Sequence, residues 1–223
     1  MDRNLLCQAL SKVIIGFLIV GLLIFLPAGT LDFWNGWLLI SILFIPMFGA
    51  GLVMMFRNPD LLRKRLNVKE KESDQKKVIA LSGMLFLAVF ITAGLNFRWK
   101  WMHLPDSMVW AAAALFLLFY LLYAEVLREN AYLSRTVEVQ EGQKVIDTGL
   151  YGLVRHPMYM VTLGLFLSMP IVLGSPFSFL IMLLYIPIIC ARIRNEEKVL
   201  TDGLEGYAEY KTRVKYRLIP YIW

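Results

Sequence analysis

The sequence has few of the residues with which soluble enzymes build nucleophilic or metal centres. Its 223 residues include two cysteines and two histidines. Cys7 and Cys190 are far apart, no CxxC pair occurs, and two histidines cannot form a conventional zinc site without carboxylates. We therefore expect both thiols to be packing residues, with no disulfide and no metal. The sequence also lacks a GxGxxG turn after a strand, a Walker A loop, a nucleophile elbow and an HExxH motif.

Long apolar runs are present instead, and 58% of the residues are hydrophobic. This composition is typical of membrane proteins. A helix needs about 20 apolar residues to cross a bilayer core that is about 30 Å thick. We predict four transmembrane helices, over residues 13–28, 37–56, 78–97 and 108–127.

The last apolar region differs from the first four. Its two arms, residues 160–173 and 177–191, are each short for a full span and are joined by Gly-Ser-Pro. A tilted or partly submerged helical hairpin fits this pattern better than two independent spans. The predicted fold is thus an all-α integral membrane protein with four transmembrane helices and a C-terminal helical hairpin.

The distribution of charge predicts the orientation of these helices. The net charge is +6, and eight basic residues lie in the loop 57–77, whereas the turn around Asp32 has none. Basic residues beside apolar segments indicate contact with anionic lipid headgroups rather than with nucleic acid. By the positive-inside rule the loop 57–77, the segment 128–159 and both termini face the cytoplasm. We expect any cofactor pocket on that side, and the absence of a targeting signal favours a prokaryotic plasma membrane.

The most polar stretch beside an apolar run is GLYGLVRHPMYM, residues 149–160. Proline disfavours the α conformation in the residue before it and suits the first position of a helix. Arg155 and His156 should therefore lie at the N-terminal mouth of the fifth apolar helix, where free N–H groups and the helix dipole favour an anion. The alternative is a well-capped helix start with interfacial aromatic residues and no ligand.

A second polar cluster, ARIRNEEKVL at residues 191–200, ends the hairpin. Arg192 and Glu196 are four residues apart and share a helix face, while Glu197 points elsewhere. Charges this close to hydrocarbon indicate a polar pocket at the membrane surface, although an ordinary surface pair is the alternative. The preceding segment, 129–149, predicts either a short β-like hairpin or an irregular connector.

Taken together, GLYGLVRHPMY, the apolar hairpin, RIRNEEKVL and GYAEYKTRVKYRLIPYIW resemble the isoprenylcysteine carboxyl methyltransferase family. This family belongs to a wider group that includes phospholipid N-methyltransferases. The resemblance covers about residues 129–223 and makes them the expected methyltransferase core, with residues 1–128 as N-terminal transmembrane helices. It implies S-adenosylmethionine as cofactor, bound without a Rossmann domain at the cytoplasmic end of the last helices.

The resemblance also implies roles for individual residues. Arg192 is expected on the reacting group of the substrate, and Glu196 on the cofactor. Eukaryotic members have a cofactor-binding glutamine at the place occupied here by Thr136, so that contact stays open. The other residues expected against the cofactor are Gln143, Lys144, Val145, Ile146, Tyr151, His156, Pro157, Met158 and Tyr159.

The predicted function is S-adenosylmethionine-dependent methyl transfer to a lipophilic acceptor in the membrane. The acceptor is expected to be an isoprenoid or lipid carboxylate, or else an amine or thiol. One alternative is an NADPH-dependent membrane reductase of the sterol-reductase type, because the C-terminal sequence YRLIPYIW resembles the tail of those enzymes. The other is a non-enzymatic membrane protein.

Overall fold

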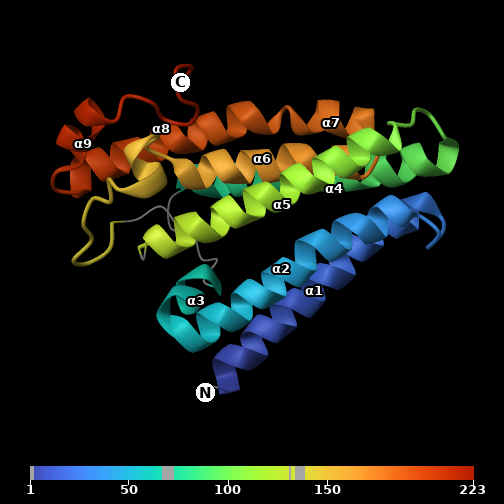
Figure 1. Cartoon of the computed structure of the whole chain (residues 1–223), viewed down its shortest axis with the longest axis horizontal. Helices are drawn as coiled ribbons and strands as arrows, with labels where there is room; N and C mark the ends of the chain where they lie inside the picture. The colour runs from blue at the N-terminus through green and yellow to red at the C-terminus, as the bar shows by residue number, and fades with distance from the viewer. Residues whose placement is uncertain (1–2, 67–72, 131, 134–138) are drawn as a thin grey trace.

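The computed structural model describes residues 3–66, 73–130, 132–133 and 139–223, and within these ranges every regular element is a helix (Figure 1). The elements are α1 (Arg3–Ala28), α2 (Trp34–Arg57), α3 (Pro59–Leu66), α4 (Ser73–Trp99), α5 (Asp106–Glu129), the 3-10 turn η1 (Gly149–Gly152), α6 (Pro157–Val172), α7 (Pro176–Met182), α8 (Tyr185–Gly203) and α9 (Tyr207–Arg213).

Five described stretches are long and apolar enough to cross a membrane: Asn4–Ala28, Trp34–Arg57, Lys76–Trp99, Asp106–Glu129 and Pro176–Gly203. The first four contain the four predicted spans. The predicted all-helical integral membrane architecture is therefore confirmed. The fifth apolar helix along the chain, α6, is shorter, as its sequence predicted.

The second arm of the predicted hairpin is longer than expected. It continues past Ala191 through the charged stretch to Gly203, so that α7 and α8 together are long enough for a span. Only Leu183 and Leu184 separate the two helices. The break lies just before Pro187, which has no amide hydrogen to donate to the Leu183 carbonyl. That carbonyl instead accepts from the Ile186 amide at 3.1 Å.

Two connecting segments also differ from the expectation. The basic loop contains the helix α3, which begins where the Asn58 side chain accepts a hydrogen bond from the Leu61 amide at 3.1 Å. Asn before Pro59 is a helix start signal. Residues 139–148 form a turn and a bend joined by irregular chain, without a strand, so that part is an irregular connector rather than a β-like hairpin. Thr136 lies outside the described residues.

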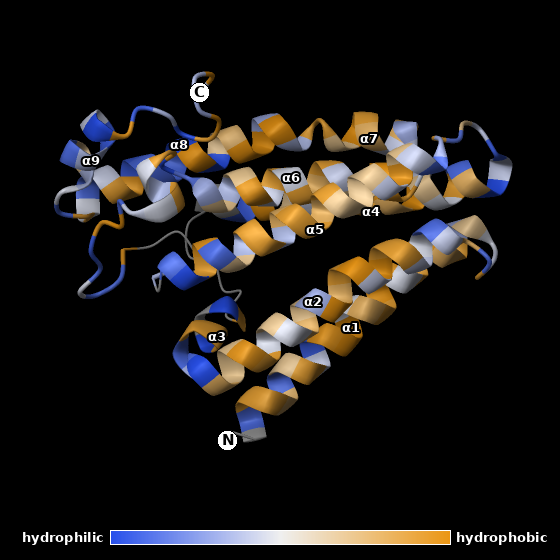
Figure 2. Ribbon diagram, viewed as in Figure 1, coloured by the Kyte–Doolittle hydropathy of each residue, from blue (hydrophilic) through white to orange (hydrophobic). Residues whose placement is uncertain are grey.

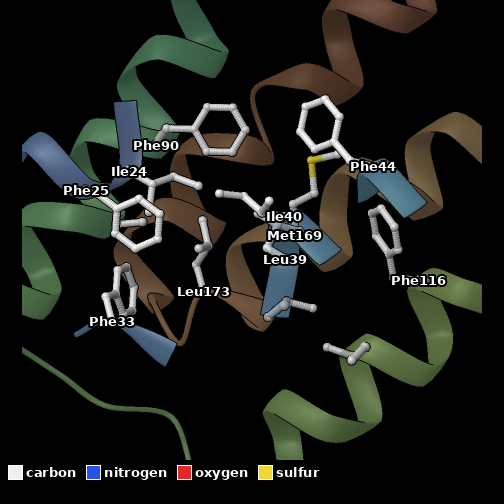
Figure 3. Packing of buried hydrophobic residues seen from close by; sticks show 14 of the residues in the cluster. Ile24, Phe25, Phe33, Leu39, Ile40, Phe44, Phe90, Phe116, Met169 and Leu173 are labelled. Carbon is white, nitrogen blue, oxygen red and sulfur yellow. The ribbon is translucent and has the colours of Figure 1, made fainter. Parts of the chain in front are cut away.

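The main core lies where α1, α2, α4, α5 and α6 meet (Figure 3). Ile24, Leu39 and Phe116 are fully buried there. The helices α1 and α4 cross closely at Gly94, where an added Cβ would lie 2.5 Å from the Ile24 carbonyl oxygen. This core draws on residues from both sides of position 129, and the division of the chain at that position remains a prediction.

The polar segments gather at one end of the bundle. Figure 1 shows the N-terminus, α3, the start of α6 and α9 at the end opposite to the turns that follow α1 and α4. In Figure 2 the middle of the long helices is predominantly hydrophobic, and the hydrophilic colours lie toward their ends. The fold thus places the 139–156 segment and the end of α8 together, beside the start of α6.

Candidate functional site

The turn before α6 is held by the C-terminal segment. His156 occupies the N-cap position of α6 and Pro157 its first turn, as the sequence predicted. The backbone amides of Arg155 and His156 donate to the carbonyls of Tyr216 and Arg217, both at 2.9 Å. These two hydrogen bonds fix the backbone from which both side chains project.

A buried ion cluster forms around Glu197, of which only 4% is exposed. Its carboxylate accepts from Arg155 Nε at 2.7 Å and from Arg217 Nε at 2.8 Å, and lies 3.4 Å from His156 Nε2. Arg155 Nη1 also donates to the carbonyls of Val214 and Lys215. Glu197 therefore points away from the Arg192–Glu196 face, as predicted, and it ties the α6 turn to the C-terminal segment.

Tyr159 connects the two polar motifs of the sequence. Its hydroxyl donates to the Glu196 carboxylate and accepts from Arg192 Nε at 2.9 Å. The Arg192 guanidinium lies 5.8 Å from the centre of the Tyr159 ring. Glu196 Oε1 is in turn 4.0 Å from His156 Nδ1. This arrangement is a shared polar cluster on α6 and α8 rather than an isolated surface pair.

This cluster lies on a cavity of about 820 Å³. The structure brings to its wall nearly all the residues that the sequence singled out. Pro157 is not among the described lining residues; it is buried at the start of α6 and shapes the helix mouth. The predicted residues on the wall are Gln143, Lys144, Val145, Ile146, Tyr151, His156, Met158, Tyr159, Arg192 and Glu196.

The same cavity extends into the apolar interior of the bundle. Helices α2, α4, α5 and α6 all contribute to that part of the wall. The polar cluster and a space lined by apolar side chains therefore belong to one cavity. The apolar lining residues include Leu43, Met47, Phe86, Phe116, Leu165 and Met169.

Sequence reasoning missed two tyrosines of α9 that complete the polar wall. Tyr207 lines the cavity, and its buried hydroxyl has no hydrogen-bond partner among the described residues. Burial, together with the nearby carboxylates of Glu197 and Glu196, raises the pKa of Tyr207, so the hydroxyl stays protonated and can donate. Tyr210 donates to the Tyr151 carbonyl at 2.7 Å. The signal for both was their spacing of three residues, which puts them on one helix face.

The remaining surroundings of Tyr151 were also not predicted. Asn130 Nδ2 donates to the Tyr151 hydroxyl at 3.0 Å. Burial raises the pKa of Tyr151, and this hydroxyl is likewise neutral. Of the two cysteines, Cys7 is exposed, contrary to its expected packing role, and Cys190 is half-buried.

A comparison with protein families gives a match over residues 110–202, to the isoprenylcysteine carboxyl methyltransferase (ICMT) family. The match shows a similarity to this family over 93 of the 223 residues, which is less than half of the chain. The matched stretch runs from α5 into α8 and contains His156, Tyr159, Arg192 and Glu196. Both halves of the polar cluster thus fall within the part of the chain that matches this family.

Two further proteins resemble this chain. The solved structure of the eukaryotic intramembrane Ras methyltransferase ICMT has a similar fold, with a TM-score of 0.50 and 17% identity, over 100% of this chain and 87% of that one. The Delta(14)-sterol reductase TM7SF2 of Mus musculus is 30% identical over 91 residues. That match covers 40% of this chain and 22% of the reductase.

Proposed function

We propose that this protein transfers a methyl group from S-adenosylmethionine to a lipophilic acceptor, at the cytoplasmic face of a prokaryotic plasma membrane. The observation that carries the proposal is the single cavity, which joins the Arg192–Tyr159–Glu196 cluster to the apolar interior. A water-soluble donor and a lipophilic acceptor need such a shared space to meet. The match of residues 110–202 to the ICMT family supports the same reaction class.

The residues present suit this donor, which carries a carboxylate, an ammonium group and a sulfonium cation. Glu196 is the only carboxylate among the described residues that line the cavity, and it provides a site for positive charge. The unpartnered Tyr207 hydroxyl provides a donor for the ligand. The residues that would hold the donor with them are Gln143, Lys144, Val145, Ile146, Tyr151, His156, Met158 and Tyr159.

Bound there, S-adenosylmethionine would supply a methyl group activated by its positively charged sulfur, and transfer of that methyl group to an acceptor atom would leave a neutral thioether. The chain itself then has to align, desolvate and hold the reactants. Arg192 binds an anionic acceptor group, and Tyr159 fixes Arg192 relative to Glu196. The apolar wall excludes water from the chemistry.

A carboxylate acceptor needs no general base, because its oxygen is already a nucleophile. An amine acceptor would have to lose a proton, for which His156 and Glu196 are the nearest groups on the wall. Glu197 is poorly suited because two arginines already occupy its oxygens. We therefore favour a lipid or isoprenoid carboxylate over an amine or thiol.

A second candidate function is NADPH-dependent reduction of a sterol-like lipid. The observation that favours it is the 30% identity with the Delta(14)-sterol reductase over 91 residues. NADPH would use the same cavity but is a phosphorylated dinucleotide, whereas S-adenosylmethionine has one nucleoside and no phosphate. The two proposals therefore differ in the ligand that stabilises the folded protein.

Thermal unfolding of the detergent-purified protein distinguishes these candidates. S-Adenosylmethionine, S-adenosylhomocysteine and NADPH are added in parallel. A ligand that binds only the folded state stabilises it by about 2.7 kcal/mol at a hundred times its Kd. For a chain of this size each kcal/mol raises Tm by about 2–4 °C. We expect a rise with the two adenosyl ligands and none with NADPH. A rise with NADPH alone would favour the reductase, and no rise with any ligand would favour a non-enzymatic protein.

A further inference from the structure

Two cations of the N-terminal half line the cavity and have no part in the proposed methyl transfer. Lys12 comes from α1 and Arg65 from α3. Among the described residues neither has a carboxylate partner. Lys12 donates to the Leu66 carbonyl, and Arg65 donates to the Tyr123 hydroxyl on α5.

A purely structural role explains Lys12 better than Arg65. Lys12 reaches the last carbonyl of α3, where cations commonly satisfy unpaired backbone oxygens. Arg65 instead reaches from α3 to α5, and its guanidinium lies 5.5 Å from the centre of the Tyr123 ring. A guanidinium has five N–H donors in a fork that matches carboxylate and phosphate oxygens. The Tyr123 hydroxyl is its only partner among the described residues, so most of its N–H donors have no hydrogen-bond partner within that part of the chain.

The charge of the described cavity wall also favours an anion. Lys12, Arg65, Lys144 and Arg192 all line it, whereas Glu196 is the only carboxylate. Arg155 also lines it but is paired with the buried Glu197. Positive charge therefore exceeds negative charge even with one cationic ligand group on Glu196.

Apolar side chains line the same cavity as Arg65. Met47 and Met54 of α2, Leu62 of α3 and Ile79 of α4 share the cavity wall with it. A ligand that uses both features has an anionic head and a hydrocarbon chain. We propose that Arg65, assisted by Lys12, binds the phosphate or carboxylate headgroup of an amphiphile whose chain lies along this apolar wall. This site rests on the cavity and its charges and does not depend on the identity of the methyl donor.

The test uses the full-length protein in uncharged maltoside micelles. Dodecyl phosphate and dodecylphosphocholine are added as matched anionic and zwitterionic amphiphiles, and Tm is recorded against mole fraction. The variants are Arg65→Gln, Arg65→Lys and the control Arg63→Gln. Arg63 lies on the same helix, is not among the lining residues and pairs with Asp60 at 2.7 Å.

We expect dodecyl phosphate to raise the Tm of the wild-type protein more than dodecylphosphocholine does. Arg65→Gln should need a roughly ten- to hundredfold higher mole fraction of dodecyl phosphate for the same rise in Tm, because the substitution removes hydrogen bonds from a charged group. Arg65→Lys should recover part of the effect and Arg63→Gln all of it. Equal losses in Arg65→Gln and Arg63→Gln would indicate diffuse attraction to the basic surface and overturn the proposal. An equal response of the wild-type protein to both headgroups would overturn it as well.

Two further ligand additions extend this test. The first identifies the source of the headgroup, and the second distinguishes the headgroup site from the site of the methyl donor. If phosphatidylglycerol raises Tm as dodecyl phosphate does, and the control phosphatidylcholine does not, the ligand is a bilayer lipid. If only the single-chain amphiphile raises Tm, the ligand resembles the methyl acceptor. Arg65→Gln should keep its response to S-adenosylhomocysteine. Loss of that response with an unchanged response to dodecyl phosphate would assign Arg65 to the donor's carboxylate and refute the headgroup site. Absence of any S-adenosylhomocysteine response would refute only the proposed methyl transfer.

Discussion

The hydroxyl of Tyr159 is the smallest feature on which the proposed site depends. Tyr159→Phe removes the atom that links Arg192 to Glu196 and leaves the ring in place. Hydrogen bonds to charged groups contribute about 1.5–3 kcal/mol, so we expect about ten- to hundredfold weaker binding of S-adenosylhomocysteine. Calorimetric titration measures the change. Tyr221→Phe is the control because Tyr221 is 88% exposed, and equal affinities of both variants would contradict the bridging role.

Glu197 serves stability rather than ligand binding. Glu197→Gln leaves Arg155 and Arg217 without their shared countercharge, and Arg155 is only 8% exposed. Breaking a buried ion pair by removal of one partner costs about 3–5 kcal/mol. We expect a fall in Tm of roughly 10 °C at about 2–4 °C per kcal/mol. The exposed Glu205 provides the control Glu205→Gln, and a similar Tm for the two variants would show that the cluster contributes little.

Local sequence predicts only part of this site. The His156–Pro157 turn follows from two adjacent residues and their backbone preferences, and the shared face of Arg192 and Glu196 follows from helical spacing. The Arg155–Glu197 pair joins residues 42 positions apart, and no local pattern indicates which carboxylate an arginine will meet. Arg217 was missed for the same reason, whereas Tyr207 had a local signal in its spacing from Tyr210. Ligand contacts of all these residues stay predictions.

At the scale of the elements, the contact of α1 with α4 depends on one missing side chain. In Gly94→Ala the added Cβ would lie 2.5 Å from the Ile24 carbonyl oxygen and 2.9 Å from the Ala28 amide nitrogen. Backbone atoms cannot move aside as a side chain can, so the helices must separate. Overpacking of this kind costs about 1–3 kcal/mol. Thermal unfolding in detergent should show a lower Tm for Gly94→Ala.

Gly83 offers a matched control on the same helix. An added Cβ there meets nothing within 4 Å, and alanine favours helix over glycine by about 1 kcal/mol. Gly83→Ala should therefore leave Tm unchanged or raise it slightly. A loss of the same size in both variants would show that close packing at Gly94 is not the cause.

The sequence predicts a helix correctly where the length of an apolar run is sufficient evidence for it. The four long apolar helices followed from the length of their apolar runs. The end of α8 was placed too early because the charged residues 192–198 were taken to end the hairpin arm, whereas the helix continues through them to Gly203. The helix α3 was hidden in a basic loop, although Asn58–Pro59 gave a start signal.

The polar segments of the molecule gather at one end, opposite to the turns that follow α1 and α4 (Figure 1). We predict that this polar end is cytoplasmic. Lys76 and Asp32 are both exposed. Lys76 is expected on the cytoplasmic side of the membrane and Asp32 on the exterior side. In a background with Cys7→Ser and Cys190→Ser, a membrane-impermeant maleimide should label Asp32→Cys in intact cells. Lys76→Cys should react only after the cells are opened. The reverse pattern would invert the orientation.

The central claim, that the polar cluster on α6 and α8 binds the methyl donor, is tested most directly by calorimetric titration of S-adenosylhomocysteine into the purified protein. Wild-type protein and Glu205→Gln should bind with the same affinity. Glu196→Gln, which removes the carboxylate that faces the cavity, should bind at least about tenfold more weakly. Equal affinity of Glu196→Gln and the wild-type protein, or binding of NADPH without binding of S-adenosylhomocysteine, would contradict the account.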